Sequence, residues 1–128
     1  MIVLDTHAWI WWAAQSAKLG RRARSRIESA ERIGVAAVSV WEVAMLVAKR
    51  RIEFDRPTLT WVRQALLLPR IELLALTPEV CIRAAELGPA FPGDPADRMI
   101  VATAIEARAV LLTRDKRLRT AELVDTVW

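Results

Sequence analysis

The sequence predicts an α/β fold with a short central parallel sheet of four to five strands, covered on both faces by helices. Short, uninterrupted apolar segments recur along the chain, and segments with helical periodicity lie between them. Uninterrupted apolar strands are typical of a sheet that is buried on both faces, as parallel sheets are. With 128 residues, of which 54% are hydrophobic and 27% charged, the chain has the size and composition of one globular domain, residues 1–128.

The first half of the chain contains two of the apolar segments. Residues 2–4 (Ile-Val-Leu) form the first strand and end at Asp5, after which the pattern indicates a helix over 6–15. A basic segment, 21–31, is expected to form a second helix. The run VAAVSV over 35–40 predicts the second strand, which leads into a helix over 39–50.

The second half repeats the alternation and contains two clear helix starts. Thr77-Pro78 and Asp94-Pro95 each combine a capping side chain with a proline suited to the first helical turn. The expected elements are, in order, a helix over 57–68, a strand over 71–76, helices over 77–87 and 95–108 with a Gly/Pro-rich loop at 88–95 between them, a strand over 109–113 and a short strand over 124–128.

The amino-acid composition excludes some classes of function and favours others. Lysine and arginine outnumber acidic residues 19 to 15, and the net charge of +4 favours a polyanionic partner, although each basic cluster alone is also explained as a solvated helix face. The single cysteine, Cys81, and the single histidine, His7, exclude an internal disulfide and a His- or Cys-based metal site. Because neither a membrane-spanning segment nor a signal peptide is recognisable, we expect a cytoplasmic protein without a membrane partner.

Four carboxylates stand where predicted strands end or helices start. Asp5, Glu42 and Asp115 follow the first, second and fourth strands, while Asp97 lies in the first turn of the helix that leads into the fourth strand. An open parallel sheet gathers such positions at one edge. Grouped carboxylates repel one another unless a cation lies among them, and oxygen ligands suit Mg²⁺ or Mn²⁺. A carboxylate-held divalent ion in a basic protein indicates phosphodiester hydrolysis.

Taken singly, each acid also has a structural explanation. Asp5 is suited to cap the helix after it, Ser39 and Glu42 match a capping box, Asp97 is a favourable first-turn charge behind the cap Asp94, and Asp115 suits a turn. The convergence of all four on one end of one sheet favours the metal pocket.

Four segments, in order along the chain, resemble the motifs of the PIN-domain ribonucleases and, among them, the VapC toxins of bacterial type II toxin–antitoxin modules. They are IVLDTHAWIWW, VSVWEVAML, GDPADRMIVATA and LLTRDKRL. The resemblance implies a single PIN-like domain with an α/β/α sandwich fold. It also implies that Asp5, Glu42, Asp97 and Asp115 form an acidic pocket that holds Mg²⁺ or Mn²⁺, with assistance from Thr113. Many members carry a histidine where this chain has Gly93, a departure that bears on loop conformation or substrate contact.

The resemblance also implies the activity and the partners. We expect a metal-dependent endoribonuclease that acts as a toxin on structured RNA such as tRNA or rRNA loops. A cognate VapB-like antitoxin would cover the pocket, and a second copy would complete a homodimer. The alternative is a catalytically inactive nucleic-acid-binding domain, which the presence of all four acids disfavours. A haloacid-dehalogenase-type phosphatase requires Asp-x-Asp at the first strand, where this chain has Asp5-Thr6-His7.

Tryptophan is frequent in one short segment. Trp9, Trp11 and Trp12 lie in the first predicted helix, on more than one of its faces. A helix that is apolar all round is buried all round, either within the core or under a second chain such as a dimer partner or an antitoxin. Stacking on a base of a nucleic acid is the third interpretation.

Overall fold

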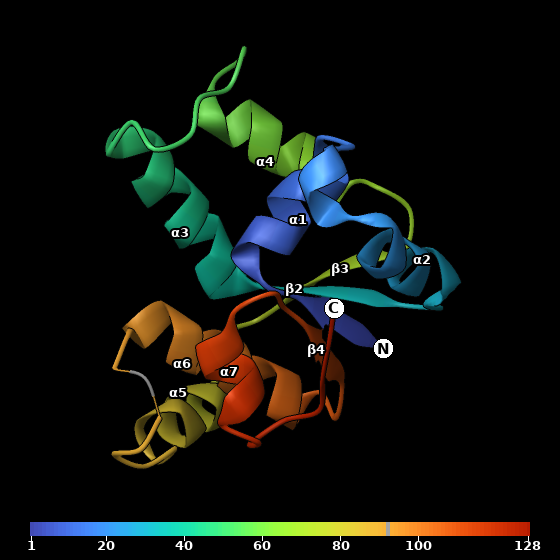
Figure 1. The fold of residues 1–128 in the computed structure, drawn as a ribbon. Helices are drawn as coiled ribbons and strands as arrows, with labels where there is room; N and C mark the ends of the chain where they lie inside the picture. The colour runs from blue at the N-terminus through green and yellow to red at the C-terminus, as the bar shows by residue number, and fades with distance from the viewer. Residues whose placement is uncertain (92) are drawn as a thin grey trace.

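Five parallel strands form one sheet in the computed structural model, which describes residues 1–91 and 93–128 (Figure 1). The α/β prediction is thereby confirmed, with the larger of the two expected strand numbers. The order across the sheet is β3-β2-β1-β4-β5, and every neighbouring pair is parallel. The strands are β1 (Ile2–Leu4), β2 (Ile33–Ala36), β3 (Ile71–Leu74), β4 (Val110–Leu112) and β5 (Thr126–Val127).

Helices cover both faces of the sheet, as uninterrupted apolar strands require. The helices are α1 (Thr6–Ala13), α2 (Arg21–Ser29), α3 (Ala37–Ala48), α4 (Thr58–Leu66), α5 (Pro78–Ala85), α6 (Pro95–Glu106) and α7 (Lys116–Thr120). In Figure 1, α1, α2 and α4 lie on one side of the sheet, and α5, α6 and α7 lie on the other. Helix α3 starts at the sheet and contacts both α1 and α6.

The central strand β1 divides the core into two layers. Ile2 and Leu4 pack with α1 and its neighbours, whereas Val3 points to the opposite face and packs with Ile100 and Val101 of α6. All three residues of the strand are buried. This alternation is the period-two pattern of a strand, and both of its faces are apolar because both are covered.

The chain order creates a switch point between β1 and β4. From β1 the chain builds outward through β2 to β3, and it then returns to place β4 and β5 on the other side of β1. Ligands in open parallel sheets bind beyond the carboxyl ends of the strands at such a reversal. The Asp5 N–H donates to the Leu112 carbonyl at 3.1 Å, so the residues that follow β1 and β4 lie side by side.

The prediction of a strand over 35–40 is wrong from residue 37 onward. Strand β2 ends at Ala36, and α3 begins at Ala37. Val38, Val43 and Leu46 are buried along α3, so this segment continues a helical spacing into the core. An apolar run with both faces buried has the same composition in a helix as in a strand, and its composition therefore did not distinguish the two.

Several smaller features also differ from the sequence-based expectations. The short helix α7 and a 3₁₀ turn at Ala17–Leu19 were not predicted, and Cys81, which its apolar helical surroundings in the sequence place in the core, is exposed on α5. Pro92, within the predicted loop over 88–95, lies outside the described residues. None of the helices in the described part of the chain is long and apolar enough to cross a membrane.

Candidate active site

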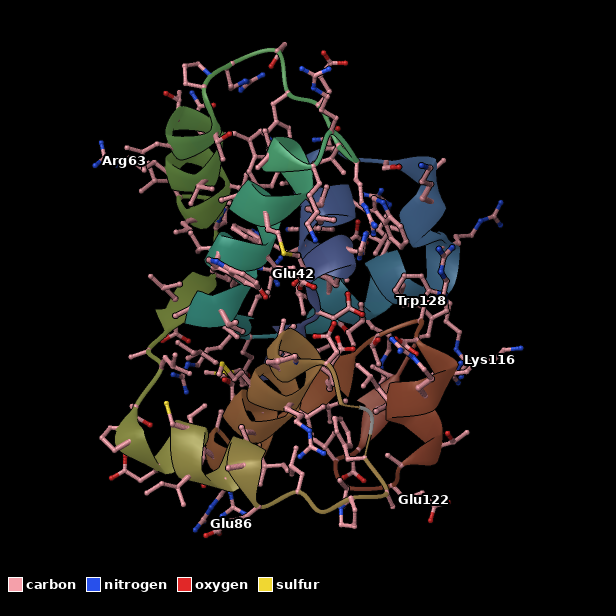
Figure 2. All side chains as sticks on the ribbon, turned by 90° about the vertical axis from the view of Figure 1, so that its left-hand side faces the viewer. Glu42, Arg63, Glu86, Lys116, Glu122 and Trp128 are labelled. Atoms are coloured by element: carbon pink, nitrogen blue, oxygen red, sulfur yellow. The ribbon has the colours of Figure 1, made fainter. Side chains whose placement is uncertain are left out.

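A cleft of about 480 Å³ opens at the carboxyl ends of the central strands. All four acids predicted from the sequence border it, namely Asp5, Glu42, Asp97 and Asp115. They come from the ends of β1 and β4 and from α3 and α6. Figure 2 shows Glu42 near the middle of the molecule, between α3 and α6. The fold therefore brings these four side chains into one cavity at the switch point of the sheet.

Asp5 both caps a helix and borders the cleft. One oxygen of its carboxylate accepts from the Ala8 N–H at 2.8 Å at the start of α1. The other oxygen accepts from the Thr113 hydroxyl at 2.5 Å. Burial raises the pKa of the Asp5 carboxyl, and these two hydrogen bonds oppose the rise. Asp5 can therefore cap α1 and belong to the site at the same time.

Glu42 is held by a buried pair of hydroxyl groups. The prediction of a capping box at Ser39 is wrong, because α3 starts earlier with Ala36 at its N-cap. Ser39 is fully buried instead, and its hydroxyl lies 3.0 Å from that of Thr6, which hydrogen-bonds to Glu42. Because Thr6 has one hydroxyl proton, it donates to Glu42 and accepts from Ser39. This series of two hydrogen bonds, from Ser39 to Thr6 and from Thr6 to Glu42, orients the Glu42 carboxylate.

Asp97 lies in the most crowded electrostatic environment of the cleft. Its neighbour Asp94 is the N-cap of α6 and accepts from the Asp97 N–H at 3.1 Å, as the sequence predicted. The Asp97 side chain itself is 16% exposed. Burial, followed by the charges of Asp94, Glu42 and Asp115, raises the pKa of Asp97 to about 6, and Arg117 opposes the rise.

Asp115 belongs to an ion pair that links two of the acids. It is the N-cap of α7, where a turn was predicted, and it accepts from the Arg117 N–H at 2.9 Å. The Arg117 guanidinium lies 2.7 Å from Asp115 and 3.3 Å from Asp97. This guanidinium holds the pKa of Asp115 below its ordinary value. A cation of the protein itself therefore sits between two of the four carboxylates.

The donor set of the cleft fits a hard divalent cation in its chemistry. All candidate ligands are carboxylate oxygens, which Mg²⁺ and Mn²⁺ prefer, and the raised pKa of Asp97 reflects burial first and neighbouring negative charge second. In residues 1–91 and 93–128, however, no group of three or more His, Cys, Asp or Glu side chains is arranged closely enough to hold an ion. The carboxylates would have to draw together, and Arg117 would have to leave its position.

The tryptophans divide into three environments. Trp9 is fully buried in the core and packs edge-on against Trp61. Trp11 and Trp12 are partly buried, and each carries an arginine over its ring. Among residues 1–91 and 93–128, the large exposed aromatic side chain is Trp41 on α3, which is 57% exposed. Its exposure was not predicted from the sequence, where Trp41 lies in an apolar run.

Several residues in and around the cleft were not predicted from the sequence. Thr6 and Arg117 lie within two residues of predicted acids, and this proximity in sequence was a usable signal. The contact of Ser39 with Thr6 could not be predicted without knowing where α3 begins. Further side chains that border the cleft are His7, Trp11, Arg51 and Arg114.

The sequence matches known proteins along most of its length. The model of the PIN domain family matches residues 2–123. The chain is 42% identical over 118 residues to Ribonuclease VapC22 of Mycobacterium tuberculosis, and the match covers 92% of this chain and 89% of that protein.

Solved structures share the fold at low sequence identity. A Rickettsia felis VapBC2 complex bound to a promoter DNA fragment superimposes with a TM-score of 0.71 at 16% identity, covering 99% of this chain and 98% of that one. VapC20 of Mycobacterium tuberculosis, described as a sarcin–ricin loop cleaving toxin, gives 0.70 at 16% identity and 98% coverage of both chains. Both the matched family model and the relative at 42% identity span nearly the whole sequence, and the chain therefore belongs to the PIN domain family.

Proposed function

We propose that residues 1–128 form a single PIN-like nuclease domain that acts as a metal-dependent endoribonuclease, the toxin of a type II toxin–antitoxin module. The observation that carries the proposal is the convergence of four carboxylates in one cleft at the switch point of the sheet. The 42% identity to a protein named as a ribonuclease supports RNA as the substrate. The VapBC complexes among the similar structures support a VapB-like antitoxin as partner.

In this proposal Asp5, Glu42, Asp97 and Asp115 hold Mg²⁺, or Mn²⁺ in its place. When bound, the metal supplies a Lewis acid that activates water and offsets charge on the scissile phosphate. The protein orients the carboxylates through hydroxyl groups behind them, as Thr113 does for Asp5 and Thr6 does for Glu42. Thr113 is fully buried, so we assign it to positioning and not to direct contact with water.

The reaction is hydrolysis of one phosphodiester bond. The oxygen of a water molecule bonds to phosphorus, the bond from phosphorus to one ribose oxygen breaks, and the proton released by the water ends on that leaving oxygen. Carboxylates around the phosphate repel it unless a cation lies among them, which supports a metal-dependent reaction.

The experiment compares RNA cleavage by the purified protein with Mg²⁺ and with EDTA. We expect cleavage only with Mg²⁺ or Mn²⁺, toxicity on expression, and loss of both in Glu42→Gln. Glu122→Gln is the matched control, because Glu122 is exposed and lies at the edge of the molecule in Figure 2. Cleavage that resists EDTA would contradict the metal, whereas RNA binding without cleavage in Mg²⁺ would favour an inactive binding domain. Sequencing the new RNA ends would identify the substrate.

We further propose that a second copy of the chain covers an apolar groove on α3 and α6. The groove holds about 370 Å³ and is bordered by Ala37, Val38, Trp41, Leu76, Pro95, Ala96 and Met99. Large apolar side chains exposed together are typical of a protein interface, and Trp41 and Leu76 are 57% and 43% exposed. Sedimentation equilibrium should give a dimer for the wild type and for Leu67→Ser, which alters an exposed leucine outside the groove, and a monomer for Trp41→Ser. A Trp41→Ser dimer as stable as that of the wild type would contradict this interface.

A further inference from the structure

The acidic cleft contains three arginines, and their charges are used differently. Arg117 is paired with Asp97 and Asp115. Within the described part of the chain, Arg51 and Arg114 border the same cleft without forming an ion pair or a side-chain hydrogen bond. An arginine that forms no ion pair does not neutralise any one carboxylate of the cleft. It remains available to a negatively charged ligand.

Arg114 differs from Arg51 because it lies on an aromatic ring. The central carbon of its guanidinium lies 4.6 Å from the centroid of the Trp11 indole. The Trp11 ring is fixed in turn by an edge contact with Trp128, whose centroid is 6.1 Å away, and by a tilted contact with His7 at 5.7 Å. Trp128 reaches Trp11 from β5 and Arg114 follows β4, so three distant segments build this contact.

Stacking on the indole gives Arg114 a defined orientation. A guanidinium over an aromatic ring is held through its face, which leaves the N–H groups at its edge free to donate. That edge is the part of arginine that binds phosphate, often through two parallel hydrogen bonds. A flexible, solvated arginine would lose more side-chain freedom on binding the same group. Trp11 therefore prepares Arg114 for an anionic ligand at the rim of the cleft.

We propose that Arg114, positioned by Trp11, binds a backbone phosphate of RNA that lies across the acidic cleft. This inference rests on the proposed ribonuclease function and assigns one contact of its substrate. Arg114 is the phosphate-binding group, whereas Trp11 acts through Arg114 as a positioning residue. The contact is to the backbone, so it contributes affinity and registers the strand without reading the base sequence.

The experiment measures binding of a fluorescein-labelled single-stranded RNA of mixed sequence over a series of NaCl concentrations. It is carried out on the Glu42→Gln background, so that the RNA stays intact in Mg²⁺. Each phosphate contact contributes about 0.7 to the slope of log K against log salt for a single strand. Arg114→Gln should reduce the slope by about this amount. Arg63→Gln should leave it unchanged, since Arg63 is exposed on α4 and points outward at the edge of the molecule in Figure 2.

The Trp11 variants separate positioning from direct contact. Trp11→Leu retains the charge of Arg114 and should lower affinity about two- to fivefold with the slope unchanged, which corresponds to the strength of an exposed cation–π contact. Trp11→Phe should restore most of this loss. On an Arg114→Gln background, Trp11→Leu should have no further effect, because the residue it positions is gone.

Three results would overturn the proposal in different ways. An unchanged salt slope in Arg114→Gln, with normal cleavage by the protein that retains Glu42, would remove the phosphate contact and leave the proposed function intact. A further loss of affinity from Trp11→Leu on the Arg114→Gln background would show that Trp11 itself contacts RNA, through stacking on a base. If the Glu42→Gln protein binds no RNA and the protein with Glu42 cuts none, the proposed function fails and this inference fails with it.

Discussion

Asp97→Asn tests the electrostatics of the cleft in the metal-free protein. In the folded state the pKa of Asp97 is about 6, against 3.8 for the ordinary side chain. The folded state therefore binds the proton more tightly than the unfolded state does, so this residue destabilises the fold increasingly as pH rises from about 4 to about 6. At neutral pH the difference of about two pKa units corresponds to about 3 kcal/mol, an upper value because the side chain is partly solvated.

Two effects reduce the expected gain. Partial solvation of the side chain weakens the electrostatic cost, whereas the attraction of Arg117 is already contained in the pKa of about 6. Asparagine also lacks the favourable first-turn charge, at about 0.3–1 kcal/mol. We therefore expect Asp97→Asn to be more stable than the wild type in EDTA at pH 7.5 by about 1–2 kcal/mol. For a chain of this length, this is a rise in Tm of about 4–8 °C.

The assay is thermal unfolding in EDTA at several pH values. The gain from Asp97→Asn should be small at pH 4, grow toward pH 6 and then stay constant. Asp94→Asn should show a smaller gain, because asparagine keeps the helix cap while the change removes one charge that raises the pKa of Asp97. Asp125→Asn, at an exposed position outside the cleft, should change stability by less than about 0.5 kcal/mol. An Asp97→Asn protein that melts below the wild type at pH 7.5 would refute this reasoning.

Three further perturbations test other parts of the account. Thr113→Val should destabilise the protein by about 1–3 kcal/mol in chemical unfolding and weaken Mn²⁺ binding, because Asp5 loses the hydroxyl group that donates to it. Thr113→Ser retains that hydroxyl and should restore both properties. Arg117→Gln should lower the Tm in EDTA and raise the affinity for Mn²⁺ in calorimetric titrations, because the guanidinium between Asp97 and Asp115 competes with the metal. Trp9→Ala should cost about 3–5 kcal/mol in urea unfolding without changing the RNA cleavage rate of the folded protein.

The parts of the site that were predictable from the sequence depend on local patterns. An apolar run that ends in an acid placed Asp5 at the end of a strand, and the Asp94-Pro95 pair fixed the start of α6 to the residue. Once both lay on a parallel sheet, the general rule for such sheets gathered them at one edge. These predictions required only neighbouring residues and the alternation of strands and helices.

The parts that were not predictable depend on distances between elements. The Thr6–Ser39 contact joins residues 33 positions apart, and it exists because α3 starts at Ala37 and not at Ser39. The Arg117 contact with Asp97 spans 20 positions and follows from the way α7 packs beside α6. No periodicity or capping motif encodes such contacts. The short α7 itself contains only five residues, too few for a clear helical pattern.

The central claim is that four acids from separate elements act together as one metal site. The most direct measurement is Mn²⁺ binding by electron paramagnetic resonance to the wild type and to each single amide variant. We predict binding by the wild type and a loss of more than about tenfold in affinity in every one of Asp5→Asn, Glu42→Gln, Asp97→Asn and Asp115→Asn. All four should remain folded in thermal melts. Mn²⁺ affinity that is unchanged in these variants, or absent from the wild type, would contradict the account.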